Sequence, residues 1–282
     1  MRKGWLVLLV FALSMLAWDA PAQTRRGWMK QVEASMLVKG RIDVSAEGYV
    51  TGYMLDDPHA AGAEVQAHLD RHLSAWKLVP AMEEGRPVAS SAKFSVRVVA
   101  KRSDAERTSL AIVAAHIDDG LPEEARVRRA HALEAPAYPR DMAKLGASGV
   151  VYVLVKVDRQ GQVVDAHAER VNLTVLAPAQ VAGGIRQRLA TTALAVAPRW
   201  TFRVPDVGPY AGEDFHVVRV PVEFSLVGGE RKEGWTVYLP GERSRPAWTS
   251  RDDGGNEAAL PGRAMLAGSG MRLLTGFEPG QG

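Results

Sequence analysis

Two histidines, His68 and His72, lie four residues apart within a segment of helical apolar spacing. At that spacing both rings share one face of a helix and can bind one metal ion. The intervening residues are Leu-Asp-Arg, so the glutamate of the zinc-protease pattern is absent. Two histidines beside an apolar stripe are also the ordinary surface of an amphipathic helix. We therefore expect no metal site here.

Other residue types that carry chemistry do not form a catalytic set. The chain has no cysteine, which excludes disulfides, cysteine nucleophiles and cysteine-ligated metals. Residues 146–149, Gly-Ala-Ser-Gly, lack the full spacing of a hydrolase nucleophile turn and indicate a helix end before a strand. Since catalysis needs convergent titratable groups, we expect a protein that is not an enzyme and uses no cofactor.

Length and composition are those of a globular protein. The 282 residues are 46% hydrophobic and 24% charged, which suits one large domain or two to three small ones. Thirty-five basic and 32 acidic residues give a formal net charge of +3. A balance this close to neutral lacks the basic excess of a nucleic-acid-binding protein.

The N-terminus has the organisation of a secretory signal peptide at residues 1–22. Arg2 and Lys3 precede an apolar run at residues 5–18, and Ala-Pro-Ala ends at Ala22 before the polar Gln23. A membrane-spanning helix needs roughly 20 apolar residues, so cleavage between Ala22 and Gln23 is favoured. The sequence predicts a protein of the bacterial periplasm, with no transmembrane segment in the mature chain; the alternative is an uncleaved inner-membrane anchor.

Residues 135–227 alternate between strand and helix patterns. Pro139 precedes a short helix that Gly146 ends, and residues 149–157 and 162–171 form a hairpin whose turn contains Gly161. Residues 215–226 are the third strand. Between them, residues 178–197 carry apolar side chains at helical spacing, namely Val181, Ile185, Leu189, Ala193 and Val196.

The same order occurs earlier in the chain. Residues 38–53 form a hairpin around Gly48, a helical segment leads to Trp76, and residues 93–96 begin a strand. Gly48 corresponds to Gly161 and Trp76 to Trp200. The sequence therefore predicts an α+β protein with tandem modules at 28–118 and 130–240, joined by a linker at 119–129 and followed by an irregular Gly/Pro-rich tail at 241–282. Each module has an antiparallel three- to four-stranded sheet with helices on one face.

A fourth strand is expected at the edge of each sheet. Residues 106–115 and 235–239 are rich in β-forming side chains and follow the third strands after polar turns. If both pair there, each module covers the edge that its third strand would otherwise leave open. For residues 235–239, a loose polar tail is an equally good interpretation.

The second half resembles the C-terminal domain of TonB-type energy transducers. The residues that carry the likeness are Tyr138, Pro139, Gly161, Trp200 and Phe202, with Val-Pro-Val-x-Phe at 220–224. The first half keeps Gly48 and Trp76 and is the degenerate copy. The resemblance implies a periplasmic module of two helices on a three-stranded sheet, which binds a short peptide of an outer-membrane transporter along its last strand.

The resemblance thus implies partner-binding residues Val218, Val220, Val222 and Phe224. Transducers also have a membrane anchor with a polar face and a long proline-rich spacer; here Ser14 is the only polar residue of the apolar run, and residues 117–134 are short and charged. We expect a non-catalytic envelope protein that binds transporter peptides or other envelope proteins by strand addition, in outer-membrane transport or envelope assembly. The alternatives are a membrane-anchored energy transducer and a metal-binding envelope protein or enzyme.

Overall fold

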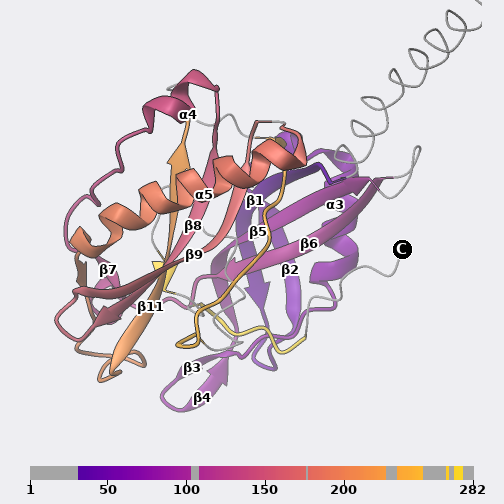
Figure 1. Ribbon diagram of the computed structural model, residues 1–282. Coiled ribbons are helices and arrows are strands. Elements are labelled where there is room, and N and C mark those ends of the chain that lie inside the picture. Colours follow the sequence, from indigo (N-terminus) through magenta and orange to yellow (C-terminus); the bar gives the residue numbers. More distant parts are fainter. Residues whose placement is uncertain are drawn as a thin grey trace, which may run out of the picture.

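The computed structural model describes residues 31–102, 108–175, 177–226, 234–249, 265–266 and 270–275. The predicted cleavage site at Ala22 and Gln23 lies outside these residues. Two main sheets lie side by side, and each has one long helix against it (Figure 1). Every strand pair in the described part of the chain is antiparallel. The expected α+β class is confirmed.

The first sheet is built around one long central strand, β1. Its strands run in the order β2–β1–β5–β6, so β6 is the expected fourth strand at that edge. The elements of this half are β1 (Glu33–Val44), β2 (Val50–Leu55), α3 (Pro58–Leu73), β3 (Ala81–Glu83), β4 (Arg86–Val88), β5 (Ser90–Arg102) and β6 (Thr108–Ile117). β3 and β4 form a separate small hairpin at the base of the molecule in Figure 1.

Alternation along β1 decides which face of the first sheet is buried. Met36, Val38 and Ile42 point to the same side and pack in one core with α3. Leu69 and Leu73, one helical turn apart, close this core from the helix. α3 begins at an Asp57 cap, whose side chain accepts the backbone N–H of the third residue after it. The apolar faces of α3 and β1 thus determine that the helix packs on this side of the first sheet.

The second sheet has a central strand, β8, that is buried at eight of its ten residues. Its order is β13–β11–β8–β9, and α5 lies across its front in Figure 1. The elements are η1 (Glu123–Ala125), β7 (Arg128–Arg129), α4 (Arg140–Lys144), β8 (Gly149–Asp158), β9 (Val163–Leu173), α5 (Ala179–Val196), η2 (Ala197–Arg199), β10 (Phe202–Arg203), β11 (Phe215–Phe224) and β13 (Met265–Leu266). β7, inside the predicted linker, pairs with β10.

The buried stripe of α5 differs from the predicted one at its first position. Ile185, Leu189 and Ala193 are buried against the second sheet as expected. Val181, however, is 47% exposed, and Ala182 is fully buried in its place. A helix has 3.6 residues per turn. Steps of three, four and four residues, from Ala182 through Ile185 and Leu189 to Ala193, stay on one face of the helix better than steps of four residues that begin at Val181.

Both halves close their hairpin turns in the same way. Gly48 has φ +89° and its carbonyl oxygen accepts the N–H of Leu78 at 2.8 Å; Gly161 has φ +79° and its carbonyl oxygen accepts the N–H of Phe202 at 2.8 Å. A Cβ at Gly48 would overlap the Leu78 carbonyl, and one at Gly161 the Phe202 carbonyl. Glycine is therefore required twice over at each turn, by the positive φ and by the close approach of another segment.

The two tryptophans take equivalent places after the helices. Trp76 and Trp200 are both buried, and each lies two residues before the residue that bonds the turn glycine. The indole N–H of Trp200 donates to the carbonyl of Glu134 at 2.9 Å. Each ring thus fills the space between helix end and sheet in its own core. The two halves have the same order of hairpin, helix, tryptophan and third strand.

The expected pairing of residues 235–239 beside β11 is wrong. These residues include β12 (Thr236–Tyr238), which pairs with Glu33–Ser35 of β1 in the first sheet. β2 pairs with β1 only from Gly40 onward, so the beginning of β1 offers main-chain groups that a strand can pair with. The Tyr238 hydroxyl also donates to Glu33 Oε2 at 2.7 Å. β12 therefore pairs with the beginning of β1 in the first half, where β2 leaves the edge of that strand open.

Described residues near the end of the chain contact both halves. Residues 239–249, called the strap below, lie along β9, and residues 270–275 lie against the first half. Leu239 pairs with Leu173 at the outer edge of β9, and the N–H of Ser244 donates to the carbonyl of Glu169 at 2.8 Å. Further on, Leu273 pairs with Leu78 of the first half. Among the described residues of the predicted tail, Met265–Leu266 form the short strand β13, and main-chain hydrogen bonds attach other described residues to both sheets.

Candidate functional site

The predicted binding strand, β11, is unequally paired on its two sides. On its inner side all of Phe215–Phe224 pairs with β8. On its outer side, the described residues pair only at Val218 and Arg219, through the two residues of β13. Pro221, next along this edge, lacks an N–H and suits a position without a full ladder. The outer side of β11 beyond β13 is therefore the candidate edge for strand addition.

Side chains proposed from the sequence to contact a partner point into the core instead. Val218, Val220, Val222 and Phe224 are all buried, and all belong to the core beneath α5. A peptide beside β11 would meet the main chain of these residues while their side chains stay covered. On the opposite face the same strand presents Glu223, which is exposed.

The Tyr-Pro landmark of the resemblance braces this strand. Pro139 caps α4, and the Tyr138 hydroxyl donates to the carbonyl of Ala147 just before β8. The Tyr138 ring lies edge-on to Phe224, with ring centroids 5.7 Å apart. Burial raises the pKa of Tyr138, so the hydroxyl stays a hydrogen-bond donor at neutral pH. Tyr138 thus positions the end of β11 and the beginning of β8.

A charged cluster that sequence reasoning missed lies across the second sheet. Glu169 lies at a register shift in β9. Ala168 and Arg170 pair with consecutive residues of β8, so no β8 residue lies opposite Glu169 in the strand pairing. Such a bulge redirects a side chain. Its carboxylate accepts from Arg219 of β11 at 2.7 and 2.9 Å and from Arg243 of the strap at 2.7 and 2.9 Å. Glu169 and Arg219 are each only 1% exposed.

The cluster keeps its carboxylate ionised. Burial by itself raises the pKa of Glu169, but the hydrogen bonds and charges of Arg219 and Arg243 outweigh burial and hold that pKa below its ordinary value. The ion pair therefore ties β9, β11 and the strap together at neutral pH. The only sequence signal was an arginine and a glutamate inside strands of apolar character.

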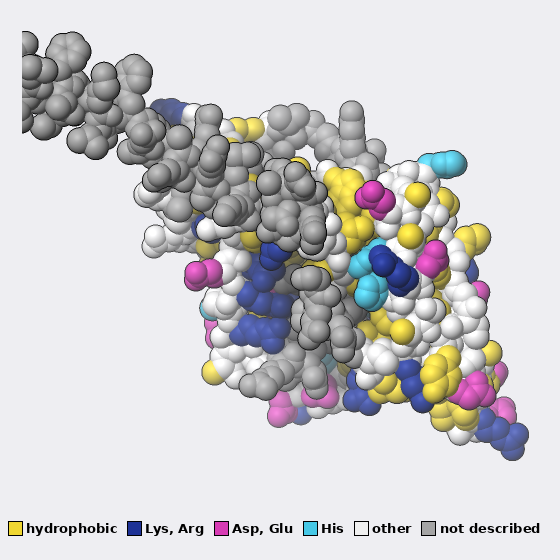
Figure 2. Space-filling view, turned by 90° about the vertical axis from the view of Figure 1, so that its right-hand side faces the viewer, with side chains coloured by type: hydrophobic (Ala, Val, Ile, Leu, Met, Phe, Trp, Pro, Cys, Tyr) yellow, Lys and Arg dark blue, Asp and Glu magenta, His cyan; other side chains and the backbone are white. Residues whose placement is uncertain are grey.

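The histidine pair is poorly arranged for a metal. The rings of His68 and His72 lie 4.3 Å apart on α3, but Nε2 of His68 is buried and has no hydrogen-bond partner in the described part of the chain. Figure 2, which looks onto the α3 side, shows histidine side chains together at the surface beside a basic one. Among the described residues, no three His, Asp or Glu side chains converge to hold a metal ion.

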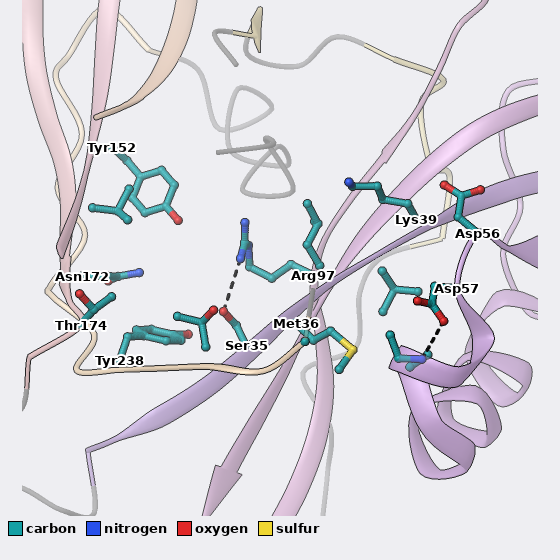
Figure 3. Close-up of a pocket in the computed structure, with 17 residues that line it drawn as sticks. Ser35, Met36, Lys39, Asp56, Asp57, Arg97, Tyr152, Asn172, Thr174 and Tyr238 are labelled. Atoms are coloured by element: carbon teal, nitrogen blue, oxygen red, sulfur yellow. Dashed lines mark hydrogen bonds between the residues drawn. The ribbon is translucent and has the colours of Figure 1, made fainter. Parts of the chain in front are cut away.

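A cavity of about 280 Å³ lies between the two halves (Figure 3). β1, the beginning of α3 and Arg97 of β5 form one side, and Tyr152, Asn172 and Thr174 of the second sheet form the other. The Arg97 guanidinium points into the space, with Nη1 3.4 Å from the Ser35 hydroxyl oxygen that accepts its N–H. The sequence did not indicate this site, because its walls come from six separate segments.

Comparison with family models, curated proteins and solved structures gives no match. None of the helices among the described residues combines the length and apolar character needed to cross a membrane.

Proposed function

We propose that this protein is a periplasmic, non-catalytic binding protein whose second half acts as the C-terminal domain of TonB-type transducers does. Its partner is an extended segment of an outer-membrane transporter, which pairs with the outer side of β11. The observation that carries the proposal is the unequal pairing of β11, complete on one side and limited to Val218 and Arg219 on the other among the described residues.

Two further observations support this proposal. Tyr138, Gly161 and Trp200 each make a specific contact that holds the hairpin, helix and last strand together. The core valines of β11 pack beneath α5, so the strand is already formed in the absence of a partner. A preformed edge loses little conformational entropy on binding, which favours main-chain pairing as the mode of recognition.

The absence of cysteine makes a site-specific test direct. A Glu223→Cys variant carries one thiol on the exposed face of β11, and a Gln187→Cys variant carries one on the exposed face of α5 as a matched control. Each is labelled with a benzophenone maleimide and irradiated with envelope extract. We expect cross-links from residue 223 to outer-membrane transporters, competed by a peptide copied from the cross-linked segment. Equal cross-linking from both positions, or none from residue 223, would contradict the proposal.

Export is tested separately. Mass spectrometry of protein recovered from cells is expected to show Gln23 as the first residue, in the periplasmic fraction. An intact Met1 start in the inner-membrane fraction would support the anchored energy transducer instead. The two outcomes differ by the mass of residues 1–22.

A further inference from the structure

The cavity between the halves lies at a break in the outer edge of β1. β12 pairs with β1 as far as Ser35, and β2 pairs with it from Gly40 onward. Residues 36–38 pair only with β5, on the inner side, in the described part of the chain, because the Lys39 carbonyl already accepts the N–H of Asp56. A strand rises about 3.3 Å per residue, so the break is about 10 Å long. Gly234, which has φ +133°, lines the cavity two residues before β12 begins.

The main chain at this break faces the cavity. Asp56 N–H donates to the Lys39 carbonyl at 3.0 Å, so the polar main-chain groups of Lys39 face outward from the sheet. In an antiparallel strand the N–H and C=O of one residue point the same way, and this direction alternates along the chain. Leu37, two residues earlier, therefore also directs its N–H and C=O outward. An added extended chain can pair with the N–H and the C=O of Leu37.

Positive side chains converge on one end of the same cavity. Arg97, which lies opposite Leu37 in the register of β5, and Lys39 both extend into it in Figure 3. Asp56 and Asp57 lie beyond Lys39, on the α3 side, where Asp57 is engaged as the helix cap. A carboxylate is thus attracted to the Arg97 end and repelled from the Asp56 end. This charge arrangement gives a bound chain a direction.

We propose that the cavity binds the C-terminal end of an extended peptide, whose main chain pairs with Leu37 and whose terminal carboxylate binds Arg97. The cavity, about 280 Å³, is just below the range of about 300–1,000 Å³ typical of small-molecule sites, so it admits only the last residues of a peptide. Guanidinium and carboxylate form strong charge-assisted hydrogen bonds. This site is separate from β11 and does not rest on the function proposed above.

The test uses the mature chain and two peptide pools. Immobilised protein is exposed to randomised hexapeptides with free C-termini and to the same pool with C-terminal amides, and retained peptides are identified by mass spectrometry. The dissociation constant of the best peptide is then measured in both forms. We expect the free acid to bind at least about tenfold more tightly than the amide, since the amide loses the ionic hydrogen bonds.

Three variants separate the two parts of the site. Arg97→Gln is expected to abolish the preference for the free acid, while Leu37→Pro, which removes an outward N–H, weakens both forms equally. Arg41→Gln, on an exposed part of β1 outside the cavity, serves as the matched control. Circular dichroism and urea midpoints verify folding. Equal binding of acid and amide, retention of neither pool, or an unchanged preference in Arg97→Gln would overturn the proposal, whatever the cross-linking at β11 shows.

Discussion

Replacing Glu169 by glutamine is expected to destabilise the second half strongly. Glutamine keeps the shape of the side chain and one carbonyl acceptor, but removes the negative charge that compensates Arg219. Arg219 is 1% exposed, so water cannot replace that charge. Breaking a buried ion pair from one side costs about 3–5 kcal/mol, and we expect a loss of that size in the free energy of unfolding.

Urea unfolding followed by tryptophan fluorescence at pH 7 measures this loss. Arg243, which binds the same carboxylate from the strap, has a side chain 26% exposed; since water can solvate much of this contact, Arg243→Gln is expected to cost only about 1 kcal/mol. The double variant Glu169→Leu with Arg219→Met leaves no buried charge, and it is expected to recover most of the single-variant loss.

The reasoning is refuted by either of two results. A loss below about 1 kcal/mol in Glu169→Gln would show that the pair is solvated. A double variant no more stable than the single one would show that shape, and not charge, decides the site. The wild type adds a pH readout. Because the pKa of Glu169 is lower in the folded state than its ordinary value of about 4.3, its stabilisation is complete above that pH and is lost as the pH falls through the folded pKa.

Three other variants test the turn, the buried histidine and the tyrosine brace. Gly161→Ala is expected to lower the free energy of unfolding by at least about 2 kcal/mol, from positive φ and overlap with a carbonyl oxygen; Gly183→Ala, inside α5 with open space around it, is the control and is expected to stabilise by about 0.5–1 kcal/mol. Burial, with the charges of neighbouring side chains, lowers the pKa of His68, so wild-type stability is expected to fall as the pH drops below about 6.5, and urea midpoints at pH 7.5 and 5.0 are expected to differ less in His68→Leu. Tyr138→Phe leaves the Ala147 carbonyl without its donor while keeping the ring, and thermal unfolding is expected to show a loss of about 1 kcal/mol; no loss would show that the hydroxyl bond is dispensable.

Local patterns were enough to predict the main elements. Alternation and β-branched residues located β8 and β11, and helical spacing located α3 and α5. The turn glycines and the two tryptophans were also found, because a positive φ or a large ring at a helix end leaves a mark on the sequence itself. The positive φ of the turn glycines and the periodicities of the strands and helices depend on residues near in the chain, whereas the contacts of Gly161 with Phe202 and of Trp200 with Glu134 join distant segments.

The orientation of β11 was not predictable in the same way. Val217, Val218 and Val220 are all buried, so both faces of the strand are apolar. Periodicity assigns a face only when the two faces differ in polarity. The sequence therefore carries no local signal that α5 covers the side of β11 to which Val218 and Val220 point.

The sequence by itself determined the two main hairpins, the two long helices, the helix end at Gly146 and the order in which hairpin, helix and third strand repeat, since these follow from spacing over a few residues. Tertiary structure alone decided that β12 pairs with β1 of the other half, and that Glu169 meets Arg219 fifty residues away. Which edge a strand joins depends on which main-chain groups the rest of the fold leaves unpaired. Which charges meet in a buried site depends on the register of strands far apart in the chain. Local sequence patterns predict neither the edge that a strand joins nor this register.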